Sequence, residues 1–293
     1  MGNNILIAIT AGLGGMLGWG FADFFAKKTI DKIGDLRTLF WQQLFGVLPL
    51  LGVFLVHPEV PKLHHFDPLF LLIFGIVEAL TYLALYAGFS EGQVSLLSPI
   101  FASYSVVVVI LSILILGEPL YFKRSLAILI TFIGILLIST DVNDLESSFR
   151  KRALRLAGLP QVVTALLGFS FWLLFLDKFL DGKPWLPYLL IIRIVVALTL
   201  LVYAATKRVS LRIVDRTLWK FLVCIGVFDV AAFSFVSYGF SHSQYPSIIA
   251  VLSATFSLPT ILLAYFFLGE RINRTQIAAA FTILCGIVLI ALN

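Results

Sequence analysis

The stretch FGIVEALTYLALYAGFS, residues 74–90, places one acidic residue, Glu78, in the middle of an apolar run. A second stretch, residues 225–241, reads IGVFDVAAFSFVSYGFS, and a shift of 151 positions lays Glu78 on Asp229. The same shift superposes the Gly-Phe-Ser triplet that ends both stretches. Two acids at equivalent positions of a repeated apolar run indicate that the carboxylates have a function.

The composition indicates that the solvent of this chain is a lipid bilayer. The 293 residues are 60% hydrophobic and 13% charged, and the mean hydropathy is +1.03, whereas a soluble domain has about 25% charged residues. The net charge of +5 does not indicate nucleic acid, because the basic residues lie in short loops where membrane topology explains them. We therefore predict an all-α integral membrane protein whose partners include the lipid bilayer but no nucleic acid.

Ten apolar runs have the length that a helix needs to cross a membrane, which is about 20 residues. Turn residues or charges separate the runs. The two weakest breaks, SEGQ at 90–93 and SHSQ at 241–244, occur at matching places in the repeat. The runs lie at 5–26, 38–56, 69–90, 94–116, 122–140, 156–176, 185–205, 218–240, 246–268 and 275–292.

The repeat extends over the whole chain. GWGFADFFAKK at 18–28 matches GFSFWLLFLDK at 168–178, and LGEPL at 116–120 matches LGERI at 268–272. Each half contains five apolar runs. Because five is odd, the second half must enter the membrane from the opposite face, which makes the two halves an inverted pair.

Many secondary transporters are built from inverted repeats, and their binding site lies near the midplane between the repeats. We therefore predict ten transmembrane helices arranged as two inverted five-helix repeats around a central cavity. The predicted boundaries are 1–140 for the first repeat, 141–155 for a charged linker and 156–293 for the second repeat.

Ionisable residues inside the apolar runs are the candidates for the site. A charge at the centre of a membrane helix costs about 2.5–3.5 kcal/mol, so such residues usually face an interior cavity. Glu78, Tyr82 and Tyr86 recur at every fourth position and share one helical face, and Asp229 begins the same spacing in the second half. The two carboxylates are predicted to bind amines or hydroxyls of a substrate or to carry a proton. The alternative is a pair of structural acids, each held neutral by a neighbouring hydroxyl.

Arg193 and Trp19 are two further candidates for the site. Arg193 keeps its charge at any accessible pH, so it either pairs with one of the two acids or holds a substrate carboxylate through two parallel hydrogen bonds. Trp19 is predicted to form the floor of the cavity. Trp19, Asp23 and Lys27 share a helical face, and this spacing favours a local Asp23–Lys27 pair near the membrane surface.

The chain resembles the EamA-type carriers of the drug/metabolite transporter superfamily. The resemblance is carried by GWGFADFFAKK in the first run, Pro99 in the fourth, Arg193 in the seventh and the LGEPL and LGERI turns. It implies ten helices around a central cavity and alternating-access transport of small metabolites. The first half departs from the pattern, because FWQQL carries Gln42 and Gln43 where the second half carries Arg193. Gln43 is therefore a candidate for the site, but not as a second cation.

The predicted function is secondary transport of a small polar metabolite, such as an amino acid or a sugar, with or without proton coupling. The protein is expected in the plasma membrane, as a monomer or a homodimer, without a metal or a cofactor. The alternative is a membrane-embedded enzyme acting on a lipid-linked substrate, because His57, Glu59, His64, His65 and Asp67 cluster in the second connection. The chain has neither an HExxH nor a C-x-x-C motif to support a catalytic metal, which favours a solvated loop.

The orientation in the membrane has two predictions. The connections after the first, third, fifth, seventh and ninth runs, each counted with the first three residues of the next run, carry 15 Lys and Arg residues, and those on the other face carry 5. Cytoplasmic loops are enriched in Lys and Arg, so the charge count puts both termini outside. The family resemblance implies cytoplasmic termini.

Overall fold

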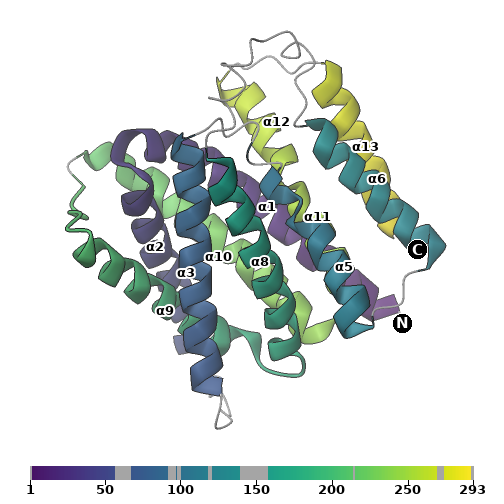
Figure 1. Cartoon of the computed structure of the whole chain (residues 1–293), viewed down its shortest axis with the longest axis horizontal. Helices are drawn as coiled ribbons and strands as arrows, with labels where there is room; N and C mark the ends of the chain where they lie inside the picture. Colours follow the sequence, from purple (N-terminus) through teal and green to yellow (C-terminus); the bar gives the residue numbers. More distant parts are fainter. Residues whose placement is uncertain are drawn as a thin grey trace.

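The protein is a bundle of helices (Figure 1). The computed structural model describes residues 2–56, 67–91, 97, 100–117, 121–138, 158–213, 215–268 and 274–291, and every regular element in these ranges is helical.

Six helices of the described chain are long and apolar enough to cross a membrane. They are α1 (Gly2–Ile33), α2 (Asp35–Val56), α3 (Asp67–Glu91), α8 (Leu159–Leu180), α9 (Trp185–Thr206) and α10 (Trp219–His242). The other helices are α5 (Tyr104–Leu116), α6 (Phe122–Ile138), α11 (Pro246–Ser253), α12 (Ser257–Leu268) and α13 (Arg274–Ala291), with the short 3-10 helices η2 (Arg216–Leu218) and η3 (Ala254–Phe256). Six predicted spans are thus confirmed in length. The remaining four correspond to shorter apolar helices, so the count of ten stays a prediction.

Large apolar side chains cover the outer surface of the bundle. Leu55, Leu114, Phe122 and Phe266 are among the most exposed, at 70%, 75%, 82% and 73%. A water-soluble monomer rarely exposes contiguous apolar surface on this scale, whereas the hydrocarbon core of a bilayer solvates it. The helix lengths and this surface agree with a multi-pass membrane protein.

The two halves of the chain are interleaved. Helix α1 packs mainly on α10 and α11, and α8 packs on α3 and α5. The helix pairs α2–α10 and α3–α9 also join the two halves, and α6 and α13 lie side by side at one edge of the bundle (Figure 1). Any cavity at the centre is therefore formed by residues of both halves.

Glycines allow α1 to approach its neighbours closely. A Cβ on Gly18 would lie 2.6 Å from the carbonyl oxygen of Phe228 on α10. A Cβ on Gly20 would lie 2.6 Å from the carbonyl oxygen of Phe256 on η3. Small residues at such contacts let helix backbones meet, which is a common source of packing energy in membranes.

The helix of the ninth predicted span is interrupted. The α-helical geometry stops after α11, η3 follows, and α12 starts two residues before Pro259. Proline lacks an N–H and disturbs the preceding turn of a helix, and a 3-10 segment inside a helix often marks such a site. The helix therefore changes its geometry in the turn just before Pro259, whereas Pro99, in the fourth predicted span, lies outside the described residues.

One face of the bundle, which we call the α1–α2 face, contains the α1–α2 turn and the loop between α9 and α10. Arg37 Nε donates to the carbonyl oxygen of Ser210 at 2.6 Å, and Trp41 Nε1 donates to that of Leu211 at 2.9 Å. These two bonds fasten the start of α2 to the loop.

The opposite face, which we call the terminal face, contains the start of α1. Ser243 Oγ, in the α10–α11 turn, donates to the carbonyl oxygen of Asn4 at 3.0 Å. Lys183 Nζ, in the α8–α9 turn, forms an ion pair of 3.1 Å with Asp67 at the start of α3. Helix α3 therefore runs from the terminal face to the α1–α2 face.

Cysteine labelling tests the orientation of the two faces. The basic loop with Arg212 belongs to the α1–α2 face, so the charge rule predicts that it is cytoplasmic. In a background without Cys224 and Cys285, an impermeant thiol reagent added to intact cells should label Asp181→Cys, on the terminal face, but not Arg212→Cys. Both wild-type side chains at these positions are exposed. The reverse labelling would support the cytoplasmic termini that the family resemblance implies.

Candidate functional site

The centre of the bundle contains one cation surrounded by three oxygen-bearing side chains. Arg193 Nη1 on α9 lies 2.9 Å from Glu78 Oε1 on α3 and 3.3 Å from Asp229 Oδ2 on α10. The same nitrogen donates to Gln43 Oε1 on α2 at 2.8 Å. Glu78 and Arg193 are 0% exposed, so four helices from both halves meet at a fully buried ion cluster.

An aromatic ring closes one side of this cluster. The guanidinium carbon of Arg193 lies 3.6 Å from the centroid of the Phe233 ring, a distance at which the cation and the ring face attract each other. Among the described residues, Arg193 Nε, Arg193 Nη2, Glu78 Oε2 and Gln43 Nε2 are buried and have no hydrogen-bond partner. Buried polar groups are normally satisfied, so these four atoms can hydrogen-bond groups other than the described side chains.

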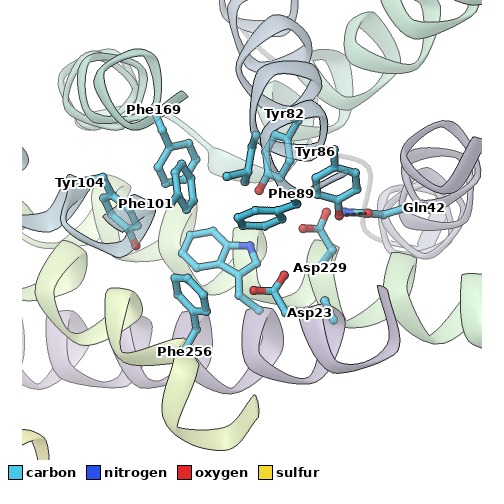
Figure 2. Close-up of a pocket in the computed structure, with 13 residues that line it drawn as sticks. Asp23, Gln42, Tyr82, Tyr86, Phe89, Phe101, Tyr104, Phe169, Asp229 and Phe256 are labelled. Carbon is cyan, nitrogen blue, oxygen red and sulfur yellow. Dashed lines mark hydrogen bonds between the residues drawn. The ribbon is translucent and has the colours of Figure 1, made fainter. Parts of the chain in front are cut away.

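A cavity lies next to the cluster and is lined mainly by aromatic rings (Figure 2). Its volume is about 30 Å³, measured as the space open to the centre of a water molecule. A site for one water needs roughly 10–15 Å³ on this measure, so this state has room for only a few atoms. The lining residues are Trp19, Ala22, Asp23, Gln42, Tyr82, Leu85, Tyr86, Phe89, Phe101, Tyr104, Phe169, Asp229 and Phe256.

The rings around the cavity hold one another in place. Trp19 packs edge-to-face on Phe169 and Phe233, with ring centroids 5.9 Å and 5.0 Å apart. Edge-to-face packing at these distances is favourable because the positive ring edge meets the negative ring face. Tyr86 donates its hydroxyl to Gln42 Oε1 at 2.9 Å. Trp19 Nε1, by contrast, is buried without a hydrogen-bond partner among the described residues.

The cavity lies between the ion cluster and the α1–α2 face. The α3 residues that line it, Tyr82 to Phe89, all come after Glu78 in the direction of that face. On the terminal side, Asp67 is buried and bonded to Lys183 at 3.1 Å and to the Tyr188 hydroxyl at 3.4 Å. These contacts join the start of α3 to the α8–α9 turn.

The structure brings together all seven residues that the sequence singles out. Four of them line the cavity: Trp19, Tyr82, Tyr86 and Asp229. The other three belong to the ion cluster and are not part of the lining: Glu78, Arg193 and Gln43. Arg193 contacts both acids rather than one.

Asp23 is the functional candidate that sequence reasoning missed. It lines the cavity, one helical turn from Trp19, whereas the spacing had favoured a surface pair with Lys27, whose side chain lies outside the described part. Phe169 was missed as well. The repeat contained a signal for it, because the match of residues 18–28 with 168–178 makes Phe169 the equivalent of Trp19.

Of the five residues in the second connection that suggested a membrane-embedded enzyme, the structure describes only Asp67. His57, Glu59, His64 and His65 lie outside them. Within the described part, no group of three or more His, Cys, Asp or Glu side chains is arranged to hold a metal ion.

Membrane-length helices around a buried polar site are typical of membrane transporters. The family model described as the EamA-like transporter family matches residues 6–140 and 156–292. The chain therefore belongs to the EamA-like transporter family and is a membrane transporter.

Two known proteins are similar to the chain over nearly its whole length. A protein of Archaeoglobus fulgidus, described as an uncharacterized transporter, is 24% identical over 295 residues that cover 98% of each chain. A protein solved by crystallography is 14% identical, with a TM-score of 0.78 over 98% of this chain and 97% of the other. The second likeness shows a shared fold. The family and the Archaeoglobus fulgidus relative do not favour the membrane-enzyme alternative.

Proposed function

We propose that the chain is a secondary transporter that moves a small polar metabolite across the plasma membrane by alternating access and exchanges protons for it. The observation that carries this proposal is the buried ion cluster of Glu78, Arg193 and Asp229 beside a cavity formed by both halves. Charges buried in a membrane protein are costly and usually belong to a substrate or ion pathway. The protein would act as a monomer or a homodimer.

The inverted repeat is supported by the positions that meet at the centre. The sequence repeat makes Tyr82 equivalent to Phe233, and their ring centroids are 6.3 Å apart. It also lays the pair Gln42 and Gln43 at the place of Arg193, and Gln43 is hydrogen-bonded to Arg193 at 2.8 Å. Equivalent residues meet in this way when a two-fold axis passes between them. We therefore propose ten spans in two inverted repeats, at 1–140 and 156–293, with the site on that axis.

Alternating access follows from such an axis. The cavity lies on the α1–α2 side of the ion cluster, and the start of α3 is bonded to the α8–α9 turn on the terminal side. A pseudo-two-fold exchange of roles between the halves would produce a second state with its cavity on the terminal side. The cargo would then bind near the midplane in both states.

The charge balance of the cluster supports the proposed proton exchange. One guanidinium faces two carboxylates, Glu78 and Asp229, within 3.3 Å. With both acids ionised, the cluster has one negative charge more than its single cation balances. A buried ion set is stable only when its charges are compensated, so a proton or a cationic group of the cargo would complete it.

Counterflow in liposomes tests the proposed function. A thermal-shift screen of metabolites on the purified protein first identifies ligands, because a ligand of the folded state raises its apparent stability. A radiolabelled hit should then enter liposomes preloaded with the unlabelled compound, with saturable kinetics. Protein-free liposomes are the control. Unsaturable uptake without counterflow would indicate a channel, and conversion of the compound would indicate an enzyme.

A further inference from the structure

The described charged residues that line the cavity are all acidic. Asp23 and Asp229 are the charged members of the lining among the described residues, and no described lining residue is basic. Arg193 is close by but is not part of the lining, because its Nη1 is shared by Glu78, Asp229 and Gln43. A ligand in the cavity therefore meets carboxylates and not the guanidinium.

Asp23 has capacity for a ligand. It is half-buried on α1, and no described side chain is hydrogen-bonded to it or ion-paired with it. Helix α1 packs along α10, which carries Asp229. Figure 2 shows the Asp23 and Asp229 side chains entering the same space from these two helices.

The rest of the lining fits an organic group rather than a bare ion. Trp19, Tyr82, Tyr86 and Phe169 are all less than a tenth exposed and present rings around the two carboxylates. Ring faces attract cations within about 6 Å of their centroids, and aromatic cages are the usual recognition site for substituted ammonium groups. Rings also pack on flat apolar bodies.

We infer that the cargo is an organic ammonium ion with an aromatic or similarly flat apolar body. Its ammonium group would lie between Asp23 and Asp229, and its body would lie among the rings after these move apart, because the cavity described above has room for only a few atoms. This inference rests on the proposed transport function and names the class of its cargo. Three carboxylates and one guanidinium gather here, so a cation reduces the excess negative charge, whereas an anion increases it.

The same carboxylates give a reason for the proton exchange. An ammonium ion and a proton both neutralise a carboxylate, so binding of one weakens binding of the other. Cargo entering the cavity would release a proton from Asp23 or Asp229, and protonation on the other side of the membrane would release the cargo.

Three probes that share one aromatic body but differ in charge test the inference. They are 2-phenylethylammonium, 2-phenylethanol and 3-phenylpropionate, measured by isothermal titration calorimetry on the purified chain in detergent near pH 7. An alkyl amine is protonated there, as lysine is. The cation should bind at least tenfold more tightly than the alcohol, and the anion should not bind. Equal binding of the alcohol, or tighter binding of the anion, would overturn the inference.

The carboxylates are then removed one at a time. Asp23→Asn should weaken cation binding about tenfold and leave the alcohol unchanged, and Asp229→Asn should act in the same direction. The matched control is Asp181→Asn, which makes the same change at an exposed turn residue. Asp229 is ion-paired and its variant is at risk of not folding, in which case Asp23→Asn decides. Unchanged cation binding by folded Asp23→Asn protein would contradict the inference.

Counterflow separates this inference from the proposed function. Saturable exchange of a neutral or anionic metabolite, with no binding of the ammonium probe, would overturn the cargo class and leave the transporter in place. Binding of the ammonium probe through Asp23, with no exchange of any compound, would support a cation site and overturn the transport proposal.

Discussion

Arg193→Gln is expected to lower the free energy of unfolding in detergent by about 3–5 kcal/mol, the usual cost of removing one partner from a buried ion pair. The variant leaves Glu78 and Asp229 buried without the cation that lies 2.9 Å and 3.3 Å from them. Either the carboxylates take up protons or the helices separate to admit water. Chemical denaturation followed by tryptophan fluorescence measures the loss.

Three variants show whether the ion cluster causes this loss. Arg216→Gln makes the same change at an exposed residue and should alter stability by no more than about 0.5 kcal/mol. Combining Arg193→Gln with Glu78→Gln and Asp229→Asn should restore much of the stability, because a neutral set needs no compensation. Arg193→Lys keeps the charge but lacks the planar fork, so an intermediate loss is expected. If Arg193→Gln is no less stable than the Arg216 variant, the cluster is not a stabilising element.

Replacing Glu78 or Asp229 by its amide is expected to uncouple transport from protons. In liposomes with a pH gradient of one unit, exchange of one proton per cargo molecule supports up to about tenfold accumulation, since one unit corresponds to about 1.36 kcal/mol. For at least one of Glu78→Gln and Asp229→Asn, this accumulation should disappear while counterflow without a gradient persists, because an amide cannot exchange a proton. Uptake of the radiolabelled cargo with and without the gradient is the measurement.

The control for the amide variants is Glu91→Gln, at the exposed end of α3, which should respond to the gradient as the wild type does. Two results would contradict proton exchange at the cluster. Either the wild type ignores the gradient, or both amide variants still accumulate cargo like the wild type.

The acids of the buried ion cluster could be singled out from the sequence because their positions are constrained twice. Glu78 and Asp229 are costly in a membrane helix, and they also occupy equivalent positions in the repeat. Both features pointed to one location, and the structure brings both acids to Arg193. The membrane-length helices were predictable for a similar reason, since hydrophobic thickness fixes the length of an apolar run.

The lining of the cavity was harder to predict. Phe101, Tyr104 and Phe256 line it, yet aromatic residues in an apolar run face lipid, core or cavity equally well. Only the tertiary contacts distinguish these cases, such as the 4.8 Å between the rings of Tyr104 and Phe169. Asp23 was not singled out because the local spacing to Lys27 gave an adequate explanation, whereas its place in the lining beside Asp229 depends on how α1 packs on α10.

In the proposed inverted repeat, the two halves differ in the residues that line the cavity, which would make the two sides of the carrier chemically unequal. The repeat makes Leu173 the equivalent of Asp23 and Phe169 the equivalent of Trp19. A cavity on the terminal side would therefore offer leucine where the α1–α2 side offers a carboxylate. Such a difference cannot decide the direction of net movement, which depends on the gradients alone. Under the proposed mechanism it would give each side its own half-saturating cargo concentration. The same molecule would then bind on the acidic side at a concentration at which it dissociates on the other side.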